Sequence, residues 1–253
     1  MRIDVHFTPD HLDEMTFRDK TVVIIDVLRA STSIVAALAN GARQIIPATT
    51  VESAVKISGN LFGDAFLLAG ERNGKMIEGF DLGNSPREFS EDVVGGKSII
   101  FSSTNGSQAL AKGRFARHVL VCAFTNISAV ARFLHTGRTD LAILCAGNGG
   151  QFSLEDAVCA GMLVQKLQEE QLDSFSDGAL AARALYKTYG RSILKMLRMA
   201  DHGRQLEELG YGNDLALCAS TDSVRVIPVL EGNIIKAIRL ADQDETTAAA
   251  SKS

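Results

Sequence analysis

The sequence predicts an α/β fold in which a mostly parallel or mixed sheet carries helices on both faces, followed by a C-terminal helical segment and a β-hairpin. Three observations predict it. Short apolar runs alternate with segments of helical periodicity up to residue 170. Hydrophobic residues make up 46% of the 253 residues, enough for a substantial core. Several apolar runs end in Gly, Asn, Ser or an acid, as buried parallel strands often do at a ligand site.

The apolar runs and the segments between them predict the individual elements. Expected strands are Ile3–Phe7, Thr21–Asp26, Gln44–Pro47, Ala65–Ala69, Ser98–Ser102, His118–Cys122 and Leu141–Cys145. Expected helices are Thr32–Asn40, Val51–Ser58, Pro86–Val93, Gln108–Lys112, Ile127–His135 and Leu154–Glu170. Because strands and helices alternate, the sheet is expected to be parallel or mixed and covered on both sides.

The C-terminal third has a different pattern. From Asp177 to Leu217, Ala, Leu, Arg and Lys recur at helical spacing, which predicts two or three helices. Val224–Val229 and Ile234–Ile238 flank a turn with Gly232 and predict a hairpin. We therefore expect a single domain over residues 1–241, with 177–238 as a candidate helical and hairpin subdomain and 242–253 as a flexible tail.

Charge and cysteine usage restrict the possible partners. The net charge is −4 and the pI about 5.8, so neither nucleic acid nor an anionic membrane surface is an expected partner. The N-terminus has no signal-peptide core, and no apolar run approaches the ~20 residues of a membrane span, so a cytoplasmic location is expected. The 4 cysteines, Cys122, Cys145, Cys159 and Cys218, are scattered in apolar contexts and are expected to be buried free thiols.

The segment Val22–Ser33 is the most informative part of the chain. Four apolar residues lead to Asp26, followed by Arg29 and by Ser31 at the start of a helical pattern. A carboxylate can bind a metal, and an Arg beside a helix N-terminus can bind an anion. The alternative for Asp26 is a purely structural role as a cap of the following helix.

Three further loops are rich in Gly, Asn, Ser and acids. Residues 69–86 contain Glu71, Arg72, Asp81 and Asn84, and end in Ser85, Pro86 and Glu88, which match a capping box. Residues 102–107 contain Thr104, Asn105 and Gly106, which suit a phosphate cradle or an ordinary strand-to-helix turn. Residues 145–156 contain Asn148 and Glu155, with Ser153 and Asp156 in capping-box positions.

The acids of these loops point to a cation. Mg²⁺ binds oxygen ligands and retains several waters, so carboxylates gathered at strand ends are suited to it. Arg29 and Arg72 lie in the same loops and can bind anions, so the loops are typical of a site for Mg²⁺ and a phosphorylated acid. The candidate acids are Asp26, Glu71, Asp81, Glu155 and Asp156.

At these loops the chain resembles the 2-phosphosulfolactate phosphatase family. The resemblance is carried, in order, by Asp26-Val-Leu-Arg-Ala-Ser-Thr-Ser, Gly70-Glu-Arg-Asn-Gly, Gly79-Phe-Asp-Leu-Gly-Asn-Ser-Pro, Thr104-Asn-Gly-Ser and the segment from Cys145-Ala-Gly to Glu155-Asp-Ala-Val-Cys-Ala-Gly. It implies an α/β homodimer that hydrolyses (2R)-2-phospho-3-sulfolactate to 3-sulfolactate and phosphate, with Mg²⁺, on the route to coenzyme M.

Combined with this resemblance, the residues give a specific hypothesis. Metal binding and water activation are assigned to Asp26, Glu71, Asp81, Glu155 and Asp156, with the first three as catalytic candidates. Binding of the substrate's anionic groups is assigned to Arg29, Ser31, Arg72, Asn84, Thr104, Asn105, Gly106 and Asn148. Whether a phosphoenzyme forms is open, and Asp26, Ser31 or Thr32 would carry it.

Other functions compete with this hypothesis. A haloacid-dehalogenase-type phosphatase would need a second Asp where Leu28 stands, which disfavours it. A cysteine hydrolase similar to isochorismatase could use Asp26, Lys97 and Cys122, although no flanking charge activates that thiol. The remaining alternatives are a phosphatase for another phosphorylated hydroxy acid and a non-catalytic module that binds phosphorylated metabolites.

Overall fold

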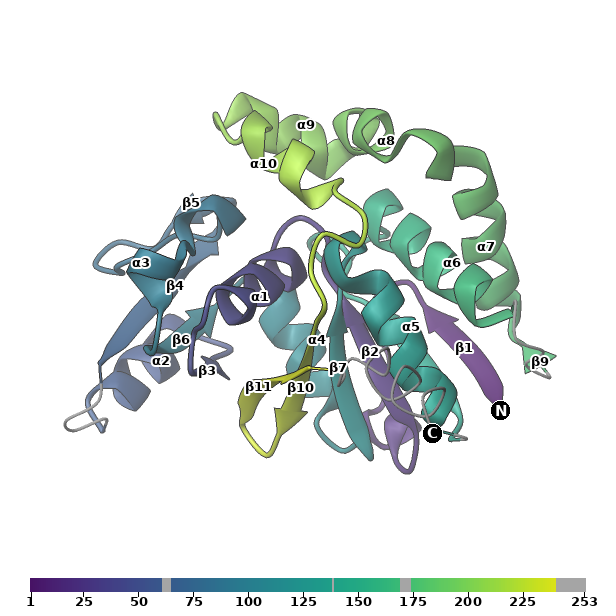
Figure 1. Ribbon diagram of the computed structural model, residues 1–253, viewed down its shortest axis with the longest axis horizontal. Coiled ribbons are helices and arrows are strands. Elements are labelled where there is room, and N and C mark those ends of the chain that lie inside the picture. The colour runs from purple at the N-terminus through teal and green to yellow at the C-terminus, as the bar shows by residue number, and fades with distance from the viewer. Residues whose placement is uncertain (61–64, 138, 169–173, 240–253) are drawn as a thin grey trace, which may run out of the picture.

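The computed structural model describes the chain except residues 61–64, 138, 169–173 and 240–253 (Figure 1). The expected flexible tail and the end of the expected helix Leu154–Glu170 lie outside the described residues. The α/β class is confirmed: helices surround one mixed, mostly parallel sheet.

The sheet has 11 strands in the order β5-β4-β6-β3-β11-β10-β7-β2-β8-β1-β9. Every strand expected from the apolar runs is present, with small shifts at the ends, and the two-residue strands β5 and β9 extend the sheet edges. The bounds are β1 (Arg2–His6), β2 (Thr21–Ile25), β3 (Gln44–Pro47), β4 (Phe66–Arg72), β5 (Lys75–Met76), β6 (Ser98–Ser102), β7 (His118–Cys122), β8 (Leu141–Cys145), β9 (Ser174–Phe175), β10 (Val226–Glu231) and β11 (Ile234–Arg239).

The expected C-terminal hairpin is confirmed, and it lies in the middle of the sheet. Strands β4, β6 and β3 form one parallel block, and β7, β2, β8, β1 and β9 form another. Between them, β11 is antiparallel to β3 through the pair Ile235 and Ile45, and β10 is antiparallel to β7. The hairpin therefore joins two blocks that are far apart in the sequence, as its yellow ribbon shows in Figure 1.

The helices follow the expected alternation as far as residue 168. Their bounds are α1 (Ala30–Ala39), α2 (Val51–Ser58), α3 (Glu91–Val94), α4 (Gly106–Gly113), α5 (Ile127–Thr136), α6 (Leu154–Gln168), α7 (Asp177–Tyr189), α8 (Ile193–Met199), α9 (Asp201–Glu208) and α10 (Gly212–Cys218). Short 3₁₀ turns are η1 (Glu14–Phe17), η2 (Pro86–Glu88), η3 (Phe124–Asn126) and η4 (Gly190–Ser192).

Two expectations about helices were wrong. The helix expected over Pro86–Val93 is divided into η2 and α3, because the Ser85 hydroxyl donates to Asp214 at 2.7 Å instead of capping a helix. The region from Asp177 to Leu217 contains α7, α8, α9 and α10 rather than two or three helices. The chain breaks there at an extended Ala200 and at Gly210, whose φ of +88° suits glycine.

Strand β2 shows why the sheet is covered on both faces. Val22 and Ile24 belong to the core that includes α1 and α4, whereas Val23 and Ile25 belong to the core that includes α5 and α6. Successive side chains of a strand point to opposite faces, so a continuous apolar run needs helices on both sides. This packing fixes the end of β2, and with it the position of Asp26.

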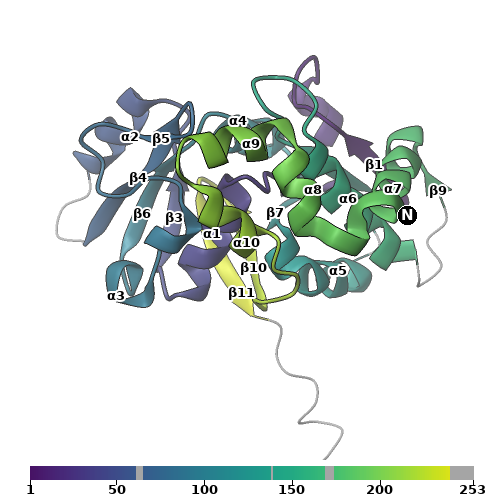
Figure 2. The same cartoon turned by 90° about the horizontal axis from the view of Figure 1, so that it is seen from above.

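Helices α8, α9 and α10 (Ile193–Cys218), hereafter the cap, lie across the top of the molecule in Figure 1 and in front of the sheet in Figure 2. The loop between β2 and α1 passes directly below them. The cap therefore closes over the edge of the sheet at which β2 ends.

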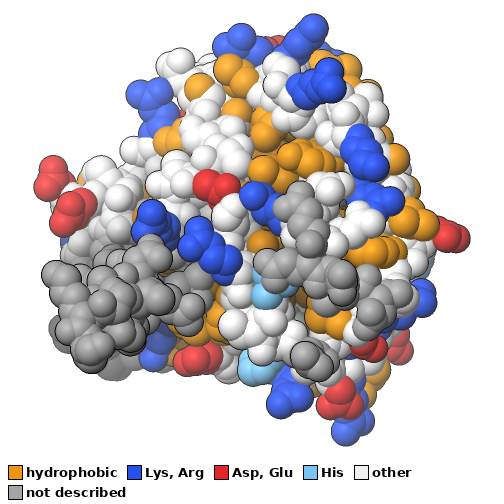
Figure 3. All heavy atoms as spheres, turned by 45° about the vertical axis from the view of Figure 1, so that its right-hand side comes forward, with side chains coloured by type: hydrophobic (Ala, Val, Ile, Leu, Met, Phe, Trp, Pro, Cys, Tyr) orange, Lys and Arg blue, Asp and Glu red, His pale blue; other side chains and the backbone are white. Residues whose placement is uncertain are grey.

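The surface mixes charged and apolar side chains. On the face shown in Figure 3, Lys and Arg side chains are spread among uncharged ones, and hydrophobic side chains come to the surface between them. Leu180 of α7 and Met199 of α8 are among the exposed large hydrophobic residues. Among the described helices, none combines the length and the apolar character that crossing a membrane would require.

Candidate active site

Four loops and the cap surround one small cavity of about 110 Å³. The loops are the same four that the sequence singled out for Gly, Asn and acids. The lining residues come from the end of β2, the end of β4 and the loop after it, the loops after β6 and β8, and α9. They are Asp26, Leu28, Arg29, Glu71, Asn73, Gly74, Asn84, Thr104, Asn105, Asn148, Gly149, His202 and Gln205.

Asp26 is the most perturbed acid that lines the cavity. Burial raises the pKa of Asp26 from 3.8 to about 7, and the charges of Glu71 and Glu155 add to the rise. His202 and the Ala30 N–H, which donates to Asp26 Oδ1 at 3.2 Å, act in the opposite direction. Asp26 thus accepts the first N–H of α1, whose N-cap residue is Arg29, and also lines the cavity. A carboxyl with a pKa near neutrality can exchange protons during a reaction.

Glu71 ties two loops together at the cavity wall. Its carboxylate accepts hydrogen bonds from Thr104 N at 2.7 Å and from Gly74 N at 2.8 Å, and a further one from the Thr104 hydroxyl. The side chain is 7% exposed. Glu71 therefore fixes the relative positions of the loops after β4 and β6 while it stays within reach of a ligand.

Asp156 and Glu155, at the start of α6, are buried behind this cavity. The Ser153 hydroxyl accepts from Asp156 N at 3.5 Å, which is half of the expected capping box. The Asp156 carboxylate accepts hydrogen bonds from Val27 N at 2.8 Å and Gly147 N at 3.1 Å. Burial raises the pKa of Asp156 well above its ordinary value, and the charges of Asp26 and Glu155 add to this. Glu155 faces His202 Nδ1 at 3.5 Å.

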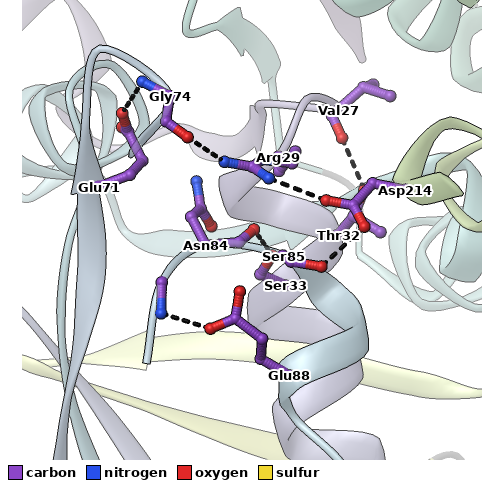
Figure 4. A network of polar contacts seen from close by, with 11 residues as sticks. Val27, Arg29, Thr32, Ser33, Glu71, Gly74, Asn84, Ser85, Glu88 and Asp214 are labelled. Carbon is purple, nitrogen blue, oxygen red and sulfur yellow. Dashed lines mark hydrogen bonds and ion pairs between the residues drawn. The ribbon is translucent and has the colours of Figure 1, made fainter. Parts of the chain in front are cut away.

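Arg29 is held in a buried network rather than pointing freely into the cavity (Figure 4). Its guanidinium donates to Asp214 Oδ2 and to the Gly74 carbonyl, both at 2.8 Å, and stacks 4.2 Å from the ring centroid of Tyr211. The peptide bond between Leu28 and Arg29 is cis. Arg29 thus joins the β2 loop to the β4 loop and to α10, and it presents only part of its surface to a ligand.

Two predicted substrate-binding positions have distinctive surroundings. The Asn84 side-chain oxygen is buried and has no hydrogen-bond partner, although Asn84 lines the cavity. Such an orphaned oxygen indicates a missing ion or donor. Gly106 packs so closely on the site that an added Cβ would lie 2.6 Å from Ala30 Cβ and 2.8 Å from Asp26 Oδ2.

Three further predicted residues lie outside the cavity lining, as Gly106, Glu155 and Asp156 also do. Asp81 is exposed and accepts a hydrogen bond from Leu68 N at 2.8 Å, which anchors the loop to β4. Arg72 donates to the Ser102 hydroxyl and to the Glu71 carbonyl. Ser31 is buried in α1 and its hydroxyl accepts from Asp26 N at 2.9 Å. The structure therefore does not bring Asp81 or Arg72 to the other candidates, and it places Ser31 in support of Asp26.

The cap supplies functional candidates that sequence reasoning missed. His202 and Gln205 of α9 line the cavity, and Asp214 of α10 binds both Arg29 and Ser85. His202 and Gln205 lie in the polar, amphipathic helix α9, for which a solvent-exposed face is the default expectation. Asp214 is 2% exposed, and an aspartate is almost never fully buried unless it is paired, but this burial is visible only in the structure.

The cysteine-hydrolase alternative gains nothing from the geometry. Cys122 is fully buried at the end of β7, and Lys97, at the start of β6, donates to the Val93 carbonyl at 2.7 Å. Burial also raises the pKa of the Cys145 and Cys159 thiols well above the ordinary value. All four cysteines are free and buried, as expected.

Iodoacetamide is therefore expected to leave activity unchanged in the folded protein, since the reagent does not reach a thiol that is completely buried. The measurement is phosphate release after timed alkylation, with mass spectrometry of the cysteines. Loss of activity in step with alkylation of Cys122 would support the thiol mechanism instead.

Comparison with known proteins decides the family. Residues 6–233 match the family model described as 2-phosphosulpholactate phosphatase. The chain belongs to this family. It is 40% identical over 236 residues to a probable 2-phosphosulfolactate phosphatase of Caldanaerobacter subterraneus subsp. tengcongensis, covering 93% of this chain and 98% of that protein. It is 37% identical over 229 residues to the protein of the same description from Clostridium acetobutylicum, covering 90% and 97%. Family membership places the chain among the phosphoric monoester hydrolases.

Proposed function

We propose that the protein hydrolyses (2R)-2-phospho-3-sulfolactate to 3-sulfolactate and phosphate in a Mg²⁺-dependent reaction, as a step toward coenzyme M. The observation that carries the proposal is the placement of Asp26 and Glu71 in one cavity with several side-chain amides and a hydroxyl. Carboxylates beside neutral hydrogen-bond donors suit a cation with a phosphate monoester. The names of the curated relatives support the same substrate.

The charges at the site favour a bound cation. The proposed substrate carries three anionic groups, and Asp26 and Glu71 of the cavity are acids as well. The positive charge of Arg29 is already compensated by Asp214, so a cation is needed to offset the negative charges of substrate and protein. Among the described residues, no group of three or more His, Cys, Asp or Glu side chains has the geometry of a metal site. Mg²⁺ needs only one or two carboxylates, because water and substrate phosphate complete its shell.

The donor set at the cavity fits such an ion. Asp26 and Glu71 would supply carboxylate oxygens, and Asn84 would supply its unpartnered amide oxygen. The ion would neutralise charge on the phosphate and orient the group that attacks it. Glu155 and Asp156 do not line the cavity, and the charge of Glu155 contributes to the raised pKa of Asp26.

The remaining cavity residues would position the substrate. The side-chain amides of Asn105 and Asn148 line the wall and would donate to phosphate, sulfonate or carboxylate oxygens, whereas the Thr104 hydroxyl already donates to Glu71. Asp26 is the group best placed to act on the reacting phosphate, as nucleophile or as proton carrier. Ser31 and the first turn of α1 would hold its carboxylate in place.

A comparison of substrates tests the function. Phosphate release is measured with Mg²⁺ for 2-phosphosulfolactate, for 2-phospholactate, which lacks the sulfonate, and for a simple aryl phosphate. We expect the largest kcat/KM for 2-phosphosulfolactate. Phosphate release from 2-phospholactate with a higher kcat/KM would point to another phosphorylated hydroxy acid, and release from none of them would favour the binding-module alternative.

Glu71→Gln is expected to lower kcat/KM by roughly 10²–10³-fold, because the amide turns an N–H toward the backbone donors of Thr104 or Gly74 and removes a charge from the cavity. Asp81→Asn is the matched control, since Asp81 is exposed and the amide oxygen can still accept from Leu68 N. Steady-state kinetics of both variants provide the test. An equal loss of kcat/KM in the two variants would contradict the view that Glu71 acts in the cavity whereas Asp81 only anchors its loop.

We further propose that the protein works as a cytoplasmic homodimer. Exposed hydrophobic side chains such as Met15 and Phe115 provide apolar surface of the kind that oligomer interfaces use. Light scattering coupled to size-exclusion chromatography measures the mass directly, and a mass of 27.1 kDa in dilute solution would contradict the dimer.

A further inference from the structure

A second cavity of about 420 Å³ adjoins the candidate active site. The two cavities share the side chains of Asn148 and His202. The second one lies between the loop after β8, the start of α6 and the junction of α8 with α9. A group attached to a substrate in the first cavity can therefore reach the second without leaving the protein surface.

Part of the wall of this second cavity is apolar, beside polar side chains such as Gln151 and Asp201. Phe152 is 50% exposed and Met199 is 47% exposed, and both line it together with Leu154 and Ala200. The Phe152 ring packs edge-on against Phe7 with centroids 5.4 Å apart, which holds it in place. Large apolar side chains that are exposed and ordered at a cavity are typical of ligand contact rather than of core packing.

The charges of the second cavity disfavour an anionic group. Its ionisable side chains are Glu155, Asp201 and His202, and in the described part of the chain neither Lys nor Arg lines it. His202 already faces Glu155. A sulfonate, carboxylate or phosphate placed here would meet acids without a compensating cation, so the anionic groups of a substrate belong in the first cavity.

We propose that the second cavity binds an uncharged, largely apolar substituent of a phosphorylated 2-hydroxy acid, such as a phenyl ring. The inference rests on the proposed phosphatase activity and widens its substrate class. 2-Phosphosulfolactate occupies the first cavity alone, whereas a substrate with an aryl or alkyl group on C3 also contacts Phe152 and Met199.

The test compares two substrates that differ at one substituent. Phosphate release is measured for 2-phospho-3-sulfolactate and for 2-phospho-3-phenyllactate, in which phenyl replaces the sulfonate. The variants are Phe152→Ala, Met199→Ala and, as a control, Leu180→Ala, which removes an apolar side chain that is 43% exposed on α7 and lines neither cavity. Phe152→Leu keeps an apolar contact and should restore part of any loss, and melting curves confirm that each variant is folded.

We expect the wild type to hydrolyse the phenyl substrate. Phe152→Ala and Met199→Ala should each raise its KM by roughly tenfold, with less than a twofold change in KM for the sulfonate substrate. Leu180→Ala should leave the KM for both substrates unchanged. Hydrolysis of the sulfonate substrate alone, or phenyl-substrate kinetics that are insensitive to both variants, overturns this inference and leaves the proposed function intact. Hydrolysis of the phenyl substrate alone, with the expected sensitivity, overturns the sulfolactate substrate and supports the second cavity.

Discussion

Asp26→Asn is expected to abolish phosphatase activity and, at the same time, to stabilise the metal-free protein at neutral pH. Asp26 is the buried cavity acid with the raised pKa, and kcat should fall by at least about 10³-fold when its charge and its proton exchange are removed. The Asn side-chain oxygen can still accept from Ala30 N, so the fold should be kept.

The stability gain follows from the direction of the pKa shift. Burial raises the pKa of Asp26 from 3.8 in the unfolded chain to about 7 in the native state, so the native state binds the proton more tightly. Below about pH 3.8 the carboxyl is protonated in both states and does not lower the free energy of unfolding. Between about pH 3.8 and 7 the unfolded state ionises first, and the free energy of unfolding falls as the pH rises. Above about pH 7 the full cost, on the order of 4 kcal/mol, is present.

Thermal unfolding in EDTA measures this effect. At pH 8 the Asn variant should melt several degrees above the wild type, and the difference should shrink toward zero as the pH approaches 4. The difference in melting temperature between the variant and the wild type at pH 4 serves as the control for the difference at pH 8. A variant that melts at or below the wild-type temperature at pH 8, or that retains normal kcat, would show that Asp26 is a structural cap alone.

Arg29→Ala should cause the largest loss of stability. Arg29 and Asp214 form an ion pair at 2.8 Å in which both side chains are almost completely buried, and Asp214 also accepts from Ser85. Removing Arg29 leaves a buried carboxylate without its cation, which costs roughly 3–5 kcal/mol. Activity should fall as well, because the same pair holds α10 of the cap against the β2 loop.

A surface pair provides the matched control for Arg29. Arg198 and Glu207 lie 3.5 Å apart with side chains 58% and 40% exposed, so Arg198→Ala should change the free energy of unfolding by less than about 1 kcal/mol. Urea denaturation of both variants gives the comparison. If the loss in Arg29→Ala is no larger than in Arg198→Ala, the buried network does not hold the cap.

The parts of the site that follow strands could be predicted from the sequence. Asp26 and Glu71 stand at the ends of apolar runs, and loops at the carboxyl ends of parallel strands meet at one edge of a sheet. The same argument does not tell which way a side chain in a long loop turns. Asp81 and Arg72 have the right chemistry, yet they bond to Leu68 N and to Ser102, outside the cavity.

The contribution of the cap could not be predicted, because it depends on tertiary packing. His202 and Gln205 lie in a polar helix whose sequence pattern indicates only a solvent-exposed face, and nothing local shows that the helix covers the cavity. Ser85 illustrates the same limit. Its spacing to Glu88 matches a capping box, but Asp214, 129 residues away, offers its hydroxyl a buried acceptor. Likewise, the hairpin was recognisable from its turn, whereas its place between β3 and β7 depends on long-range pairing.

The central claim is that carboxylates from separate loops share one divalent cation beside the substrate phosphate. The most direct measurement is phosphate release from 2-phosphosulfolactate by protein stripped with EDTA, before and after a stepwise return of Mg²⁺. We expect activity to disappear on chelation and to return with Mg²⁺ in the wild type, and to stay absent in Asp26→Asn. Activity that survives complete chelation would contradict the claim.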